Sequence, residues 1–512
     1  MHHHQHSLPR PAPSSRLSRR TDHRALTLLA LAPLLACADP VEGAGFDATD
    51  SDSDASATSE SADSGRPPVD DDTTGGASTG DADSDATGTF GDASTGFDAE
   101  PPPEPEPEPP PEPEPTPCPP LLNPPQHCGD GEVEPGELCF QAPTIYGVAP
   151  GLSALGLADI TADGQLDVIT ASQTQHRVAV LHGIGGGALA ASDAALISPE
   201  DEDTLYAAGP VGLAVGDLFG LDPAADVITT NQYTNNWTVL LGTGGPPTPL
   251  EFATILDVEA KPRQAALARV DDDLRGDLVL ASVTPTGGRI DLFNAELGWT
   301  TLEVPPAIAP DLVAVAELDG DTSARELVIA NTAHRSLTVL GVDPEDGALW
   351  VRGTSSPLSA GPPVALTAVD LDGDGLDSVV IAHAFSHCDV EDPPDSCAPD
   401  RVSVYDDLLA GDDALDDEHQ SYLAGHGVAS ITSGDINGDG VPDLIAGNEV
   451  SADLTLMLGD GAGGFTACEQ RPHGHAPGAL HVAVGDLNGD EIADIVTAHP
   501  IESTVQTRLA WP

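Results

Sequence analysis

One acidic pattern recurs seven times along the chain and constrains its fold more than any other feature. In the clearest copy, GDINGDGVPDLIAGN, oxygen-bearing residues and glycines alternate directly before an apolar run. The copies begin about 46 to 65 residues apart, and such a period indicates a repeat architecture. Their first acidic residues are Asp159, Asp217, Asp271, Glu317, Asp370, Asp435 and Asp486.

Each repeat has the pattern of four short antiparallel strands. An apolar segment such as HVAVGDL precedes the acidic loop, and a β-branched segment such as ADIVTA follows it. A third strand such as LTLMLGDG and a looser fourth strand complete the unit. A linear solenoid is the alternative, but the units are too long and too hairpin-like for one. We predict an all-β, seven-bladed propeller with four-stranded antiparallel blades, which protects its sheet edges by radial closure.

The last unit ends one strand short, after STVQTRLAWP. The segment FQAPTIYGVAPG, just before the first acidic loop, stands where the other units carry their fourth strand. We therefore predict that a strand near residues 143–146 pairs with residues 504–510. Such a strand would complete the final blade and join the two ends of the domain.

These repeats resemble the FG-GAP or VCBS family, which builds the seven-bladed head of integrin alpha subunits and many bacterial surface proteins. The motifs that carry the resemblance are GDINGDGVPDL, GDLNGDEIADI and LGDGAGGF, and the resemblance covers residues 140–512. It implies a binding or adhesion module whose ligand meets the face opposite the acidic loops.

The acidic loops have the ligand spacing of a calcium site. Loop positions 1, 3, 5 and 9 offer side-chain oxygens and position 7 a backbone carbonyl, which suits Ca²⁺ better than the stricter Mg²⁺. The alternative is that the loops are Asx turns only. We expect about four Ca²⁺ ions, in the first, fifth, sixth and seventh copies. The predicted ligands are Asp159, Thr161, Asp163 and Asp167; Asp370, Asp372, Asp374, Asp377 and Ser378; Asp435, Asn437, Asp439, Val441 and Asp443; and Asp486, Asn488, Asp490, Ile492 and Asp494.

The other three loops depart from this spacing. An extra residue displaces Asp226 in the second copy and Glu326 in the fourth, and the third copy is two residues short. Arg275 lies inside that third loop, where its guanidinium could replace a metal ion with a salt bridge.

The amino terminus has the pattern of an export signal. Arg16, Arg19, Arg20 and Arg24 precede the apolar run ALTLLALAPLLA, which is too short to span a bilayer as a mature helix. The following Leu34-Leu35-Ala36-Cys37 resembles a bacterial lipobox, which implies that residues 1–36 are a lipoprotein signal peptide and that Cys37 is lipidated. An ordinary signal peptide is the alternative. We expect an exported lipoprotein of the bacterial outer membrane or cell surface, anchored through Cys37.

A linker and a cysteine-rich segment separate this signal from the repeats. Residues 37–117 are acidic and rich in proline, with too few apolar residues to fold, and we expect a disordered stalk. Residues 118–139 form a short cysteine-rich segment, for which zinc binding is less favoured because paired C-x-x-C hooks are missing. Six cysteines remain after Cys37, and Cys388 with Cys397 is the favoured disulfide. Sequence leaves the pairing of Cys118, Cys128, Cys139 and Cys468 open.

The chain carries 84 Asp and Glu against 18 Lys and Arg, a formal net charge of −66. This balance argues against nucleic-acid partners and favours divalent cations. We find no G-x-S-x-G, H-E-x-x-H or P-loop motif and expect a monomeric, non-enzymatic module for an extracellular protein or glycan. The alternatives are a polysaccharide lyase or hydrolase and a purely structural envelope protein.

Aromatic and histidine residues mark a predicted ligand face. The candidates lie in or beside the connections between second and third strands and in neighbouring loops: Tyr233, Trp237, His383, His387, His426, His475 and His499. Tryptophan in a propeller also packs between blades, and Asn331 and Asn448 take the strand-end place of His383 and His499 in other copies. A shared structural hydrogen bond therefore competes with a transition-metal site.

Overall fold

The computed structural model describes residues 138–191, 195–197, 207–220, 223–245, 249–258, 260–271, 275–294, 297–384, 400–409, 415, 419–472 and 481–511. The predicted signal peptide, the lipidated Cys37, the stalk and most of the cysteine-rich segment lie outside these residues. The Cys388–Cys397 disulfide, His387, His475 and the side chain of Cys468 also lie outside them. Cys139 is buried and disulfide-bonded, and the structure leaves its partner undescribed.

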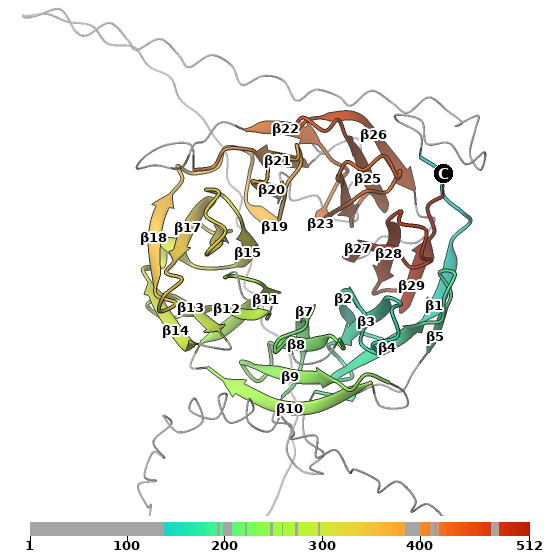
Figure 1. The fold of residues 1–512 in the computed structure, drawn as a ribbon, viewed down its shortest axis with the longest axis horizontal. Coiled ribbons are helices and arrows are strands. Elements are labelled where there is room, and N and C mark those ends of the chain that lie inside the picture. Colours follow the sequence, from blue (N-terminus) through green and yellow to red (C-terminus); the bar gives the residue numbers. More distant parts are fainter. Residues whose placement is uncertain are drawn as a thin grey trace, which may run out of the picture. The chain divides into compact units, whose positions relative to one another are not determined.

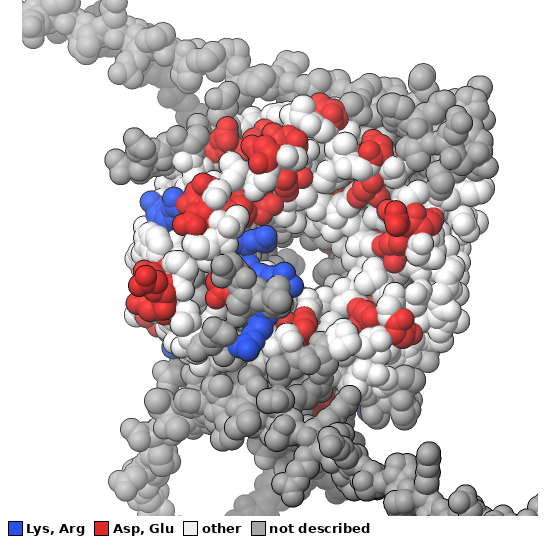
Figure 2. Space-filling model, viewed as in Figure 1, with Lys and Arg blue, Asp and Glu red and all other residues white. Residues whose placement is uncertain are grey.

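Seven antiparallel sheets surround a central opening, as a β-propeller requires (Figures 1 and 2). The predicted all-β, seven-bladed fold is therefore confirmed. In each sheet the strand that precedes the acidic loop lies innermost, and the following strands lie progressively farther out. The only described helix is the 3₁₀ turn η2, Pro306–Ile308, between the third and fourth blades.

The first three blades share this order, and the outer strand of the first is broken in two. Blade 1 comprises β2 (Leu152–Ala158), β3 (Asp167–Ser172), β4 (Arg177–Gly183), β5 (Leu189–Ala191) and β6 (Ala195–Leu196). Blade 2 comprises β7 (Pro210–Gly216), β8 (Asp226–Asn231), β9 (Asn236–Gly242) and β10 (Leu250–Asp257). Blade 3 comprises β11 (Lys261–Ala268), β12 (Asp277–Thr284), β13 (Gly287–Asn294) and β14 (Gly298–Val304).

The remaining blades repeat the arrangement. Blade 4 comprises β15 (Leu312–Ala316), β16 (Glu326–Asn331), β17 (Ser336–Val342) and β18 (Leu349–Thr354). Blade 5 comprises β19 (Pro363–Val369), β20 (Ser378–His383), β21 (Arg401–Tyr405) and β22 (Gln420–Leu423). Blade 6 comprises β23 (Val428–Gly434), β24 (Asp443–Asn448), β25 (Asp453–Gly459) and β26 (Phe465–Pro472). Blade 7 comprises β27 (His481–Gly485), β28 (Asp494–His499) and β29 (Thr504–Arg508), with an outer strand from the other end of the domain.

That outer strand is β1, Thr144–Gly147, which pairs antiparallel with β29. The register places Thr144 opposite Thr507 and Gly147 opposite Thr504, and this confirms the predicted closure. The packed region begins before the predicted boundary at residue 140, since Leu138 is 3% exposed in the core between blades 6 and 7.

The hydrophobic core consists of clusters that each lie between two adjacent blades. Every residue of β8 and β9 is buried, because each strand in the middle of a blade is covered by sheets on both faces. Trp237 of β9 and Phe293 of β13 belong to one such cluster, between blades 2 and 3. The cluster between blades 7 and 1 joins Val496 and Val505 to Val168 and thus seals the ring.

The turns between second and third strands keep one geometry in five blades. Four residues form the turn, and the last adopts a left-handed φ between 53° and 55°. These left-handed residues are His176, Asn235, Arg335, Ala452 and Ser503. In blade 3 the strands continue farther, and only Pro285 and Thr286 separate β12 from β13. Among the described residues, no helix is long and apolar enough to cross a membrane.

Candidate metal centre

The acidic loops connect the innermost strand of each blade to the second strand. In blade 6 the first carboxylate, Asp435, accepts hydrogen bonds from the N–H groups of Gly438 (2.7 Å), Asp439 (3.1 Å) and Gly440 (2.8 Å). The loop therefore folds around Asp435. Asp439 in turn accepts from Val441 N at 2.9 Å and from Asn437 Nδ2 at 3.0 Å. These contacts place the side chains of loop positions 1, 3 and 5 side by side.

The loops of blades 7, 5 and 1 share part of this hydrogen bonding. Asp486 accepts from Gly489 N at 2.6 Å and from Glu491 N at 2.8 Å. Asp370 accepts from Gly373 N at 2.7 Å, and Asp159 accepts from Gly164 N at 2.8 Å. In all four loops the N–H of position 6 thus donates to the first carboxylate.

The last carboxylate of each loop has a role that sequence did not reveal. Asp443 is fully buried, and its oxygens accept from Ile436 N (2.9 Å) and from Gly459 N at the end of β25 (2.8 Å). Through these two hydrogen bonds Asp443, at the start of the second strand, holds both the loop and the end of the third strand in place. Asp167, Asp226 and Asp494 make the same pair of contacts, and Asp277 and Glu326 make the contact within the loop.

The ionised form of this last carboxylate is disfavoured by its buried position. Burial raises the pKa of Asp443 to about 7, and the Asp439 and Asp435 carboxylates add to the rise, although the two N–H donors oppose it. Burial likewise raises the pKa of Asp494 to about 7, with Asp490 and Asp486 contributing. A cation held by the loop would offset this repulsion, because it favours the ionised form of every carboxylate around it.

Blade 5 brings three carboxylates together without the fourth. Asp370, Asp372 and Asp374 offer oxygens that all lie within 4.8 Å of one another, a spacing that a single cation could bridge. Asp377 accepts instead from Glu317 N of blade 4 at 2.8 Å, and the Ser378 hydroxyl donates to Asp406 at 3.0 Å. The loop of blade 5 thus contributes fewer side chains to one point than its sequence predicted.

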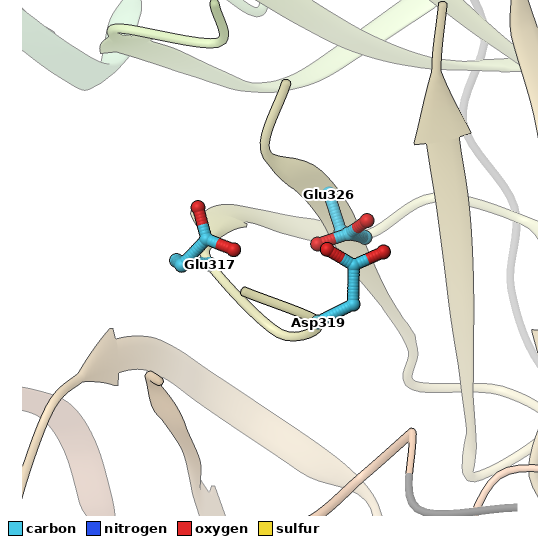
Figure 3. A group of neighbouring side chains, drawn as sticks. All are labelled: Glu317, Asp319 and Glu326. Carbon is cyan, nitrogen blue, oxygen red and sulfur yellow. The ribbon is translucent and has the colours of Figure 1, made fainter. Parts of the chain in front are cut away.

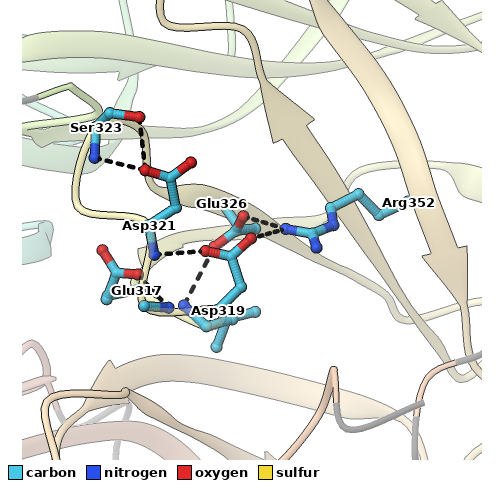
Figure 4. A network of polar contacts seen from close by, with 8 residues as sticks. Glu317, Asp319, Asp321, Ser323, Glu326 and Arg352 are labelled. Carbon is cyan, nitrogen blue, oxygen red and sulfur yellow. Dashed lines mark hydrogen bonds and ion pairs between the residues drawn. The ribbon is translucent and has the colours of Figure 1, made fainter. Parts of the chain in front are cut away.

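Blade 4 contains a second carboxylate group, which the irregular spacing had obscured. Oxygens of Glu317, Asp319 and Glu326 lie within 4.8 Å of one another, and the three side chains converge in Figure 3. The Arg352 guanidinium, from β18, donates to Asp319 Oδ2 at 2.6 Å and also to Glu326 Oε1 (Figure 4). A built-in cation therefore lies beside this loop.

Blade 4 therefore contains a built-in cation of the kind that the sequence predicts for blade 3. Arg352 comes from the outermost strand, 26 residues after Glu326 in sequence, so loop spacing alone could not reveal it. Burial raises the pKa of Glu326 in spite of the arginine. In blade 3, Asp271 accepts from Asn294 Nδ2 at 2.6 Å, and Arg275 lies half-buried.

The extra residue in the second and fourth loops leaves one structural contact of the last carboxylate intact. Asp226 and Glu326 begin their strands and accept from Leu218 N and Leu318 N, both at 3.1 Å.

The acidic loops also connect neighbouring blades through their backbones. The N–H that precedes the last carboxylate donates to the carbonyl of the first acidic residue in the previous blade: Ala225 to Asp159 (2.9 Å), Gly276 to Asp217 (3.0 Å), Asp377 to Glu317 (2.7 Å) and Ala493 to Asp435 (2.8 Å). These bonds join the backbones of neighbouring loops directly. Figure 2 shows acidic side chains in separate patches around the ring.

The predicted ligand face is only partly exposed. Tyr233 is 59% exposed and lies edge-on to His176, and His426 is half-buried. Trp237 is 0% exposed and is no surface contact, because it faces into the core between blades 2 and 3.

The two strand-end histidines do not line this surface either. His383 is 0% exposed, with Nδ1 3.1 Å from Gly361 O, and His499 is 5% exposed, with Nε2 2.9 Å from Thr497 Oγ1. Asn231 and Asn448 take the same place in blades 2 and 6 and hydrogen-bond Thr238 and Thr455. A buried side chain with a hydrogen-bond partner therefore occupies the strand-end position in each of these four blades.

The fold and the loops together define a seven-bladed β-propeller with acidic interstrand loops, a fold that serves binding and structural modules generally. The family model of the FG-GAP-like repeat matches residues 435–497, from the acidic loop of blade 6 to the second strand of blade 7. The chain therefore carries an FG-GAP-like repeat. No match was found among curated proteins.

Several solved structures are similar in fold. BBS1N, in complex with ARL6DN, is 12% identical, with a TM-score of 0.49 over 73% of this chain and 97% of that chain. Virginiamycin B lyase from Staphylococcus aureus is 12% identical, with a TM-score of 0.47 over 72% and 99%. Saccharomyces cerevisiae Sqt1 is 11% identical, with a TM-score of 0.45 over 72% and 98%. At these values the similarity carries no functional conclusion.

Proposed function

We propose that this protein is a calcium-stabilised, lipid-anchored propeller that binds an extracellular protein or glycan at the cell surface. The observation that carries the proposal is the shared loop geometry of blades 1, 5, 6 and 7, where the first carboxylate folds each loop around itself. Oxygen-rich loops of this kind suit a hard divalent cation.

The residues that would hold Ca²⁺ are the side chains at positions 1, 3 and 5 of these loops. Asp435, Asn437 and Asp439 supply them in blade 6, and Asp486, Asn488 and Asp490 supply them in blade 7. When bound, the ion would neutralise carboxylates that otherwise repel one another. Asp443 and Asp494 hold the start of the second strand beside the site, and they would regain their ordinary acidity.

The lipid anchor rests on the sequence before Cys37. Substitution Cys37→Ala should release the protein from the membrane fraction into the soluble fraction, because the proposed thioether anchor would be lost. Incorporation of labelled palmitate into the wild-type chain is the direct measurement. A protein that stays in the membrane fraction after the substitution would contradict the anchor.

The binding role is tested by probing glycan and protein arrays with the folded protein in Ca²⁺ and in chelator. We expect saturable binding to one class of ligand, weaker in chelator because the ring loses stability. A variant with Asp439→Asn and Asp490→Asn should show a smaller calcium effect, because two of the four loops lose a carboxylate. Shortening of a bound polymer over time would contradict a binding module and indicate an enzyme.

A further inference from the structure

A cavity of about 580 Å³ lies between blades 2 and 3 on the face opposite the acidic loops. Its described lining comes from the connection between β10 and β11, from the end of β12 and from the turn after β8. The lining residues are Asn235, Val258, Ala260, Lys261, Val283, Thr284 and Pro285.

The cavity exists because blade 3 is built differently on this face. β12 has eight residues, whereas β8 and the equivalent strands of other blades have six. The tip of this longer hairpin, from Val283 to Pro285, therefore lines one side of the cavity. The four-residue turn of blade 2, which ends at Asn235, forms the facing side.

The charged residue of the described lining has the sign opposite to that of the molecule. Lys261 is the only lysine in the 512 residues of a chain with a net charge of −66. It is exposed at the start of β11, and no carboxylate occurs among the described lining residues. Within the described residues its ammonium makes no ion pair, whereas Arg263 on the same strand pairs with Asp311 at 3.2 Å.

The rest of the described lining is neutral and largely apolar. Val258, Val283 and Pro285 offer aliphatic surface, and Asn235 offers an amide. Cavities of this size that combine apolar walls with a few polar groups are typical of small-molecule sites. One cation among apolar walls selects a ligand with one negative group on an apolar body.

We propose that this cavity binds a small monocarboxylate with an apolar body. The carboxylate pairs with the Lys261 ammonium, and the body packs against Val258, Val283 and Pro285. The site is separate from the acidic loops, so it requires neither bound calcium nor the surface ligand proposed above.

The probes that test this site are octanoate and its uncharged counterpart 1-octanol. Reductive ¹³C-methylation of the protein labels Lys261 as the single lysine, so its NMR signal reports directly on the cavity. Octanoate should shift this signal saturably. Octanol should bind about tenfold more weakly, because it lacks the charge that pairs with the ammonium.

Variants separate the specific pair from general charge effects, with octanoate binding measured by calorimetry. Lys261→Gln should weaken binding about tenfold, Lys261→Arg should restore it, and Val283→Trp should abolish it by filling the cavity. Arg335→Gln removes an exposed cation from the corresponding turn of blade 4 and should leave binding unchanged. Equal binding of octanoate and octanol, an unaffected Lys261→Gln variant, or no saturable binding would each overturn the proposal.

Discussion

The residue that ends the second strand of a blade differs from blade to blade. The strand-end position holds asparagine in blades 2, 4 and 6 but histidine in blades 5 and 7. An asparagine amide stays neutral, whereas a buried imidazole must stay unprotonated to avoid a charge in the core. Burial lowers the pKa of His383 to about 4; His419 and Arg401 contribute, and the hydrogen bond to Gly361 opposes the shift.

We predict that His383 makes the fold sensitive to acid. The unfolded chain binds a proton near pH 6.5 but the folded chain only near pH 4, so the free energy of unfolding falls as pH decreases through this window. At pH 5 the loss should be about 2 kcal/mol relative to pH 7.5. Urea unfolding of wild type and His383→Asn at several pH values measures it. The variant should show a smaller loss, and equal slopes would refute the assignment.

A second residue-scale prediction concerns loop position 6. Gly440 holds this place in blade 6 with φ +83°, and Glu491 holds it in blade 7 with φ +71°. Because a side chain is strained in this left-handed region, Glu491→Gly should stabilise the protein by about 1 kcal/mol in thermal unfolding. Glu491→Gln controls for the lost charge. A destabilised glycine variant would show that this backbone is not strained.

At the scale of one loop, the last carboxylate and the ligand carboxylates should behave differently. Asp443→Asn leaves one buried N–H without its acceptor and should cost about 1 to 3 kcal/mol even in chelator. Asp439 is exposed at the loop tip, so Asp439→Asn should matter only when Ca²⁺ is present. Unfolding of both variants with and without calcium distinguishes the roles. Identical behaviour of the two would contradict this division.

Blade 4 offers the complementary test. Arg352→Gln removes the cation that pairs with Asp319 and Glu326, and should cost about 2 kcal/mol in chelator. The freed carboxylates should then bind Ca²⁺, so excess calcium should recover much of the loss. Calcium binding that is unchanged in the variant would show that the arginine does not stand in for an ion.

The sequence predicted contacts within one loop better than contacts between residues far apart in the chain. The loop positions of Asp435 and Asp486 follow from spacing alone, and each carboxylate accepts hydrogen bonds from N–H groups of its own loop. The contact from Asp443 to Gly459 and the pair of Arg352 with Glu326 join different strands, so spacing could not reveal them. For Trp237 the sequence left ligand contact and packing between blades open, and the structure shows packing, because the environment of Trp237 depends on which blade packs against β9.

For the whole molecule, the repeat count and the closure were predictable because each follows from self-comparison of the chain. Seven units lacking one strand require a strand from elsewhere, and β1 supplies it. The hydrogen bonds from five of the loops to the previous blade were not predictable, because they join backbone groups and do not depend on side-chain identity. Blade 6 lacks this bond, because Pro442 stands at the donor position and has no N–H.

The closing strand should control the stability of the whole ring. A chain that begins at Leu138 keeps the pairing of β1 with β29, whereas a chain that begins at Val148 loses it and exposes the edge of blade 7. We expect the shorter chain to melt at a lower temperature and to associate in size-exclusion chromatography. Equal melting of the two chains would mean that closure by β1 contributes little.

The measurement that tests the central claim most directly is a thermal melt in excess Ca²⁺ and in chelator, combined with elemental analysis of bound metal. The loops of blades 1, 5, 6 and 7 predict about four calcium ions per chain and a large upward shift of the melting temperature. A protein that binds no calcium and melts at the same temperature in both conditions would show that the loops are hydrogen-bonded turns and nothing more.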